Sequence, residues 1–195
     1  PIANAFVNAT ALVDLDNDGA LDLFVSTYLE GAYVFYNRGG WFDVLNSKLL
    51  PNGDALMIGA PAFADLDRDG DLDIIAANWV GAALIRFGAD HRAKDRILWN
   101  EPDGFQPMIL PGVPGESLST LVMDVDRDGR DDMIIGDDGF ESDKVYLNSG
   151  YRDYRLMKKS KALLPYLGQT TNLIFVHNRD SPDSHTIPCV FASLE

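Results

Sequence analysis

Three short stretches of the chain gather carboxylates at a spacing that can hold a metal ion. Each fits the pattern D-x-D-x-D-G-x-x-D without a mismatch, and the copies begin at residues 14, 65 and 124. Alternate Asp residues converge on one point when the backbone turns sharply, and the Gly at position 6 permits that turn. Position 7 offers its backbone carbonyl, which explains why its side chain varies, and the Asp at position 9 closes the ligand shell.

The ligands expected from this pattern are Asp14, Asp16, Asp18, Ala20 and Asp22 in the first loop, Asp65, Asp67, Asp69, Asp71 and Asp73 in the second, and Asp124, Asp126, Asp128, Arg130 and Asp132 in the third, with Ala20, Asp71 and Arg130 acting through the backbone carbonyl.

An all-oxygen shell of this kind favours Ca²⁺. Mg²⁺ keeps more of its own water, and zinc prefers His or Cys, which the three loops lack. The alternative is a set of solvated Asp-Gly turns without metal, but carboxylates crowded into nine residues repel one another strongly when no cation is present. We therefore expect three Ca²⁺ sites, one in each loop.

The EF-hand begins with a similar loop but needs a Glu at position 12 and flanking helices. Position 12 here is Val25, Ala76 or Ile135, each inside an apolar run. The sequence therefore excludes an EF-hand in all three copies.

The elements around the loops read as short strands. Apolar, β-prone runs follow the loops at 21–28, 72–77 and 133–136. A further strand then ends in Asn, a tight turn containing Gly follows, and Trp41, Phe105 or Tyr151 begins the next strand. Residues 155–164 are expected to form a short helix or turn.

Each unit thus reads as four strands, and the loops recur after 51 and 59 residues. This is the pattern of a β-propeller, with one four-stranded blade per unit. We expect an all-β fold with blade units at 5–58, 59–117 and 118–168 and a degenerate unit at 169–195, in which Phe175, His177 and Arg179 replace the first three Asp residues.

Three complete blades and part of a fourth do not close a ring, since propellers have about four to eight blades. We therefore expect a fragment of a larger propeller, completed by further blades of the same or another chain. The first residue, Pro1, likewise indicates a processed or excised segment.

With these features the chain resembles the FG-GAP/VCBS repeat family, the calcium-loop propellers that include integrin α-subunit heads. Residues 58–61, Ile-Gly-Ala-Pro, resemble the element that gives the family its name, and the Asn-Gly-aromatic turn resembles VCBS-type repeats. The resemblance covers residues 5–157 most strongly. It implies a seven-bladed propeller as the commonest complete form, an extracellular, periplasmic or cell-surface location, and a role in adhesion or ligand recognition.

The formal charge of −14 argues against nucleic acid as a partner, and no apolar run is long enough to span a membrane. Much of that charge is local, because the three loops hold 14 of the 30 acidic residues. The acidity therefore reflects the metal loops more than the choice of partner.

The sequence favours a non-enzymatic recognition module with a protein or carbohydrate ligand, because it carries no nucleophile elbow, zinc-protease motif or phosphate-binding loop. Two alternatives stay open. One is a polysaccharide lyase or related enzyme, with its base among His91, Arg92 and Lys94 of an insertion at 81–95 and the adjacent Arg96. The other is a structural subunit of a larger assembly. Trp41, Trp79 and Trp99 are expected mainly in the core, and Cys189 as a buried hydrophobe.

Overall fold

The structure is a computed structural model of the 195-residue chain. It describes residues 5–28, 30–51, 58–79, 94–137 and 143–157 in full, and residues 172–175 and 190–193 as backbone. The expectations for His91 and most of the insertion, for Cys189, and for the degenerate loop beyond Phe175 fall outside the described residues.

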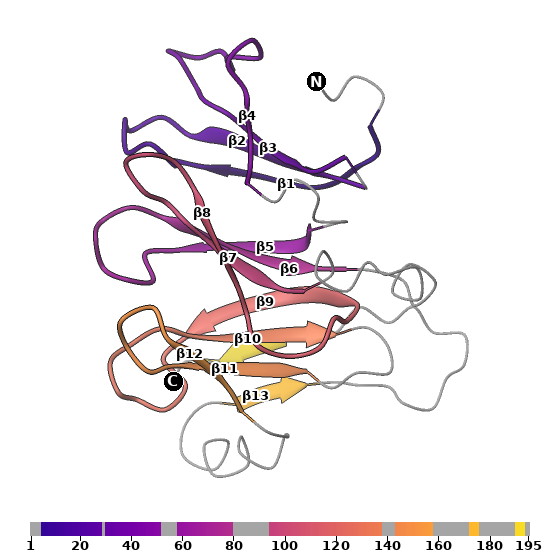
Figure 1. Ribbon diagram of the computed structural model, residues 1–195, viewed down its shortest axis with the longest axis vertical. Coiled ribbons are helices and arrows are strands. Elements are labelled where there is room, and N and C mark those ends of the chain that lie inside the picture. The colour runs from indigo at the N-terminus through magenta and orange to yellow at the C-terminus, as the bar shows by residue number, and fades with distance from the viewer. Residues whose placement is uncertain are drawn as a thin grey trace.

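Twelve of the described strands form three antiparallel sheets, each of four strands that follow one another in chain order (Figure 1). Every regular element in the described part of the chain is a strand. The first sheet contains β1 (Val7–Val13), β2 (Asp22–Thr27), β3 (Ala32–Phe35) and β4 (Lys48–Leu49). The second contains β5 (Ile58–Ala64), β6 (Asp73–Asn78), β7 (Arg96–Trp99) and β8 (Gln106–Ile109). The third contains β9 (Ser117–Met123), β10 (Asp132–Asp137), β11 (Lys144–Asn148) and β12 (Tyr154–Leu156).

A fourth pairing joins β13 (Asn172–Phe175) to β14 (Val190–Ser193). This pairing lies within the unit expected at 169–195. The all-β fold of four-stranded units is thus confirmed.

The second strand of each sheet is almost entirely buried. Phe24 in β2, Ile74 in β6 and Met133 in β10 are all fully shielded from solvent. A strand covered on both faces carries a continuous apolar run instead of an alternating one. This is why the runs that follow the acidic loops are apolar at nearly every position.

The three sheets are stacked face to face, with one apolar core in each of the two gaps (Figure 1). In the first gap the ring of Phe24 meets that of Phe63 edge to face, with centroids 5.5 Å apart. In the second gap the ring centroids of Trp99 and Tyr154 lie 6.4 Å apart. Trp99 therefore has the core position expected of it, whereas Trp41 is 59% exposed.

The first strands β1, β5 and β9 lie side by side along one edge of the stack. Asn8 donates its side-chain amide to the Ile58 carbonyl at 2.7 Å, and Thr120 donates its hydroxyl to the Ala60 carbonyl at 2.9 Å. Each first strand also carries a β-bulge at its second residue, which is Asn8, Gly59 or Leu118. Adjacent first strands that contact each other in this way form the inner edge of successive propeller blades.

A buried ion cluster joins the second and third sheets. The Lys144 ammonium lies 2.8 Å from Asp95 and 3.1 Å from Asp137, and it donates to the Ser117 hydroxyl at 3.1 Å. Both carboxylates are almost completely shielded from solvent. Since Asp95 precedes β7 and Lys144 begins β11, this cluster fixes the position of one sheet on the next.

Three strand expectations are wrong in detail. In the third sheet Tyr151 does not begin the fourth strand, because it lies in the turn and β12 starts at Tyr154. In the first sheet Trp41 does not begin the fourth strand, because Phe42 makes only an isolated bridge with Asn37 and β4 starts at Lys48. Residues 43–47 intervene, with Asn46 bonded to the Asp43 carboxylate in a local turn. Arg155 and Leu156 belong to β12 and not to a helix, because they pair with Leu147 and Tyr146 of β11.

Candidate metal centres

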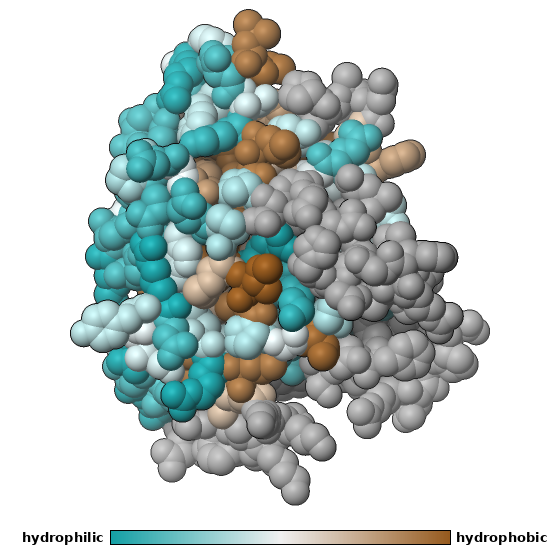
Figure 2. Space-filling view, viewed as in Figure 1, coloured by the Kyte–Doolittle hydropathy of each residue, from teal (hydrophilic) through white to brown (hydrophobic). Residues whose placement is uncertain are grey.

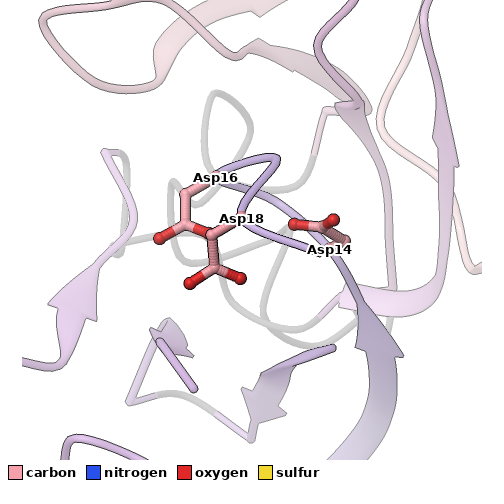
Figure 3. A group of neighbouring side chains, drawn as sticks. All are labelled: Asp14, Asp16 and Asp18. Carbon is pink, nitrogen blue, oxygen red and sulfur yellow. The ribbon is translucent and has the colours of Figure 1, made fainter. Parts of the chain in front are cut away.

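The three acidic loops join the first and second strands of their sheets. They lie together at one end of these strands, on the left edge of the stack as drawn (Figure 1). Hydrophilic side chains cover this edge (Figure 2). Each loop brings together three carboxylates whose nearest oxygens lie within 4.8 Å of one another. These groups are Asp14, Asp16 and Asp18 (Figure 3), then Asp65, Asp67 and Asp69, and then Asp124, Asp126 and Asp132.

The backbone of each loop follows the same path. Position 4 is left-handed in every copy, with φ of 56° at Asn17, 67° at Arg68 and 64° at Arg127. The Gly at position 6 is also left-handed, with φ between 86° and 100°. Two residues with left-handed backbone within three positions turn the chain sharply, so alternate side chains point into the loop.

Side-chain hydrogen bonds hold this path. The carboxylate at position 1 accepts the Gly N–H at position 6, at distances of 2.9–3.1 Å in the three loops. The carboxylate at position 5 accepts the N–H of position 7, at 2.8–3.0 Å. Ala20, Asp71 and Arg130 are thereby held at position 7, and the use of their carbonyls as ligands stays a prediction.

The Asp at position 9 has a second task that the sequence does not reveal. In the second loop, Asp73 accepts the Leu66 N–H at 3.1 Å on one oxygen and the Asn100 N–H at 2.9 Å on the other. Asp22 and Asp132 make the equivalent pairs of bonds, and all three side chains are buried. Position 9 therefore connects the start of the loop to the Asn at the end of the third strand or just after it.

Burial raises the pKa of these three carboxyl groups, and the two backbone N–H bonds oppose the rise. For Asp73 the pKa reaches about 7. A carboxylate that is costly to ionise in isolation gains from a nearby cation, and each oxygen that accepts one N–H keeps a further lone pair for it.

The residues present fit a hard cation. Asp14 Oδ1 is buried and has no hydrogen-bond partner among the described residues, and it belongs to the first group of converging carboxylates. Asp22 and Asp73 lie outside the groups that converge within 4.8 Å, whereas Asp132, which accepts the same two backbone N–H bonds, belongs to the third group. Asp128 lies outside the third group and pairs with Arg130.

An arginine contacts each loop, a feature that sequence reasoning missed. Arg38 lies 2.8 Å from Asp16 and 3.2 Å from Asp18, and Arg130 pairs with Asp128 of its own loop. Arg152 reaches across from the third sheet to Asp67 of the second loop. Arg38 and Arg152 both lie in the turn after the third strand, and that position is the signal that could have identified them.

Neighbouring loops also contact one another through position 4. Asn17 donates its amide to the Gly70 carbonyl at 3.2 Å and to the Asp71 carboxylate at 2.6 Å. One step along, Arg68 donates to the Gly129 carbonyl. The loops therefore form a connected row across the three sheets.

The turn that follows the third strand differs between the sheets. In the first sheet the left-handed positions are Gly39 and Gly40, closed by a bond from Arg38 N–H to the Trp41 carbonyl at 2.8 Å. In the third sheet the turn is one residue longer, and its left-handed residues are Gly150, Tyr151 and Arg152, with φ of 87°, 53° and 61°. A left-handed conformation costs a non-glycine residue about 1 kcal/mol, so the third turn carries strain that the first avoids.

The basic residues expected to serve a lyase are partly described. Arg96 is 2% exposed within β7, and the Lys94 carbonyl accepts the Asn78 amide at 2.6 Å. The buried position of Arg96 leaves it outside any surface cluster. His91 and Arg92 lie among the residues that are not described.

These observations define the class: an all-β protein built of propeller blades, with an acidic loop between the first two strands of each described blade. Comparison with known proteins identifies the repeat, because residues 14–76 match the FG-GAP-like repeat family. The chain therefore carries FG-GAP-like repeats, as its loop and turn signatures predict.

Two integrin alpha-3 proteins are similar to the chain. That of Mus musculus is 34% identical over 151 residues, which is 67% of this chain and 14% of the relative. That of Cricetulus griseus is 33% identical over 151 residues, with the same coverage. The chain thus spans 14% of the length of these relatives.

Proposed function

We propose that the chain is a calcium-stabilised propeller module for extracellular recognition or adhesion, without catalytic activity of its own. The observation that carries the calcium assignment is the geometry shared by the three loops, each of which brings three carboxylates within 4.8 Å. An all-oxygen donor set of this density suits Ca²⁺. The fifteen residues expected from the sequence are the proposed ligands.

In this proposal calcium is structural. Each loop connects two strands of one blade, and neutralising its carboxylates removes the repulsion that opposes the pairing of β1 with β2, or of the equivalent strands. A site occupied at a hundred times its dissociation constant adds about 2.7 kcal/mol to the free energy of unfolding. That is a large share of a typical domain stability of about 5–15 kcal/mol.

The location follows from the same reasoning. Loops of moderate affinity fill at the calcium concentrations found outside cells and stay largely empty in a cytosol. We therefore place the module in an extracellular, periplasmic or cell-surface setting, which agrees with its similarity to integrin alpha-3 proteins. No helix long and apolar enough to cross a membrane occurs among the described residues.

Recognition is favoured over catalysis by the similarity to integrin alpha-3 and by the burial of Arg96, which removes one of the candidate basic residues from the surface. The proposed blade units are 5–58, 59–117 and 118–168 with a degenerate unit at 169–195. Further blades of the same or another chain would complete a ring. The partner is proposed to be a protein or carbohydrate ligand.

Thermal unfolding with and without calcium tests this function. We expect the melting temperature to rise by at least about 5 °C when 1 mM Ca²⁺ replaces EGTA, because 1 kcal/mol corresponds to about 2–4 °C in a chain of this size. An equal concentration of Mg²⁺ is the control and should raise it far less. An unchanged melting temperature in calcium would refute the structural role.

A further inference from the structure

A groove of about 520 Å³ opens on the edge of the molecule that carries the acidic loops, between the second and third blades. Asp67 and Arg68 of the second loop line one side, and Arg130 of the third loop lines the other. Tyr151 and Arg152, from the turn between β11 and β12, also line the groove. Three arginines thus gather in one groove of a chain whose formal charge is −14.

Contacts with the fold hold the three guanidinium groups in place. Arg130 donates to the Asn148 carbonyl at 2.7 Å, and Arg68 donates to the Gly129 carbonyl. Arg152 stacks on the Trp99 ring at 4.6 Å while pairing with Glu101 and Asp67. A guanidinium has five N–H donors, so these contacts leave donors of Arg68 and Arg130 for a ligand.

Tyr151 gives an independent sign of recognition. Its side chain is fully exposed, with a relative accessibility of 107%, although it occupies a left-handed position where the first blade has a glycine. Arg152, the other strained residue of this turn, has contacts within the fold that explain its presence. Strain at an exposed aromatic residue beside a groove is typical of a functional position.

The donors in the groove select the chemistry of the ligand. Arginine offers donors only and matches a carboxylate in geometry and charge. A sugar presents hydroxyl groups that also need acceptors. The carboxylate of Asp67, which lines the groove, is already paired with Arg152, and that of Asp128 is paired with Arg130. Exposed Tyr beside Arg is the composition of protein-binding hot spots.

We propose that this groove binds a carboxylate side chain from an acidic segment of a partner protein, with Tyr151 packing against that segment. The proposal rests on the recognition role proposed above and names its site. It also predicts dependence on calcium. Asp67 and Asp128 belong to the proposed ligand sets, so a bound Ca²⁺ would neutralise their negative charge. The positive charges of Arg152 and Arg130 would then be less offset by these carboxylates and would attract an incoming carboxylate more strongly.

Fluorescence anisotropy with the full chain in 1 mM Ca²⁺ tests the proposal, with a labelled octaglutamate peptide as the probe. We expect saturable binding that weakens about tenfold or more in Tyr151→Gly and in Arg68→Gln, as is common for hot-spot residues. Tyr151→Gly should keep or raise the melting temperature, because glycine relieves the strained turn. Trp41→Ser, which alters an exposed aromatic at the equivalent turn of the first blade, should bind like the wild type.

Three outcomes overturn the proposal: no saturable octaglutamate binding, unchanged binding by both groove variants, or preference for an oligogalacturonate probe, which would assign the groove to acidic carbohydrate. A calcium titration by calorimetry on the same samples separates this result from the proposed function. Calcium binding without peptide binding would refute the groove and leave the calcium module standing.

Discussion

Asn37 donates its backbone N–H to Asp22 at 2.8 Å, which joins two signatures that lie apart in the sequence. Asp22 is the last residue of an acidic loop, and Asn37 follows the third strand of the same blade, in the isolated bridge with Phe42. Asn100 donates to Asp73 and Asn148 to Asp132 in the same way, at 2.9 and 2.8 Å. The loop and the Asn turn are therefore two halves of one structural unit in every described blade.

This relationship predicts that position 9 matters even without metal. Asp73→Ala should lower the free energy of unfolding by about 2–4 kcal/mol in EGTA, because it leaves the buried N–H groups of Leu66 and Asn100 unpaired. Denaturant unfolding in EGTA measures the loss. The matched control is Asp69→Asn in the same loop, an exposed side chain that should matter mainly when calcium is present. Equal losses for the two variants in EGTA would contradict the structural role of position 9.

The ion cluster between the second and third blades predicts a large effect at Lys144. Lys144→Met should cost about 3–5 kcal/mol, because it leaves the buried carboxylates of Asp95 and Asp137 without their cation. Urea denaturation in saturating calcium measures the change. Lys48→Met, which alters an exposed lysine of β4, should change stability by no more than about 0.5 kcal/mol. A loss below 1 kcal/mol at Lys144 would show that the cluster contributes little.

Asp137 in the same cluster predicts a dependence on pH. Burial raises its pKa above the ordinary value of 3.8, and the Lys144 ammonium opposes the rise. A carboxyl group with a raised pKa in the folded state contributes stability that is present below pH 3.8 and lost as the pH rises through its folded pKa. The wild type should therefore lose stability relative to Asp137→Asn as the pH rises from 3.8 towards neutrality. Paired denaturation curves across this range check the sign, and a difference that grows in the other direction would refute it.

Gly59 belongs to the Gly-Ala-Pro element and marks the closest approach of two inner strands. A Cβ at this position would lie 2.7 Å from the Ser117 carbonyl oxygen of the next blade. Gly59→Ala should therefore destabilise the fold by about 1–3 kcal/mol through overpacking between β5 and β9. Thermal unfolding in calcium is the measurement. A variant as stable as the wild type would mean that the blades separate at this edge without penalty.

Much of this fold could be predicted because the apolar runs and turns are local signals. The loops, the second strands and the Asn turns are all encoded within about ten residues of sequence. The fourth strand of the first blade was misplaced because Trp41 and Phe42 look like a strand start, while pairing of β4 with β3 is decided at Lys48 and Leu49. Local pattern does not fix such edge pairings.

The candidate site was predictable in most of its carboxylates and not in its surroundings. Residue spacing predicts four converging Asp residues in each loop, and the structure brings three of them together. It does not show that Arg152 reaches the second loop from the third blade, or that Asn17 bonds to the next loop, because those contacts join residues 85 and 53 positions apart. The strain at Tyr151 was equally hidden, since left-handed backbone at a non-glycine residue has no reliable sequence signal.

Calcium stoichiometry tests the central claim most directly. Isothermal titration of the metal-free chain with Ca²⁺ should show three ions bound per chain. Replacing Asp14 and Asp16 by Asn should reduce the number to two, and the same change at Asp65 and Asp67 should do so independently. The account predicts three sites that are lost one loop at a time. No calcium binding, or binding that survives the loss of carboxylates from all three loops, would contradict it.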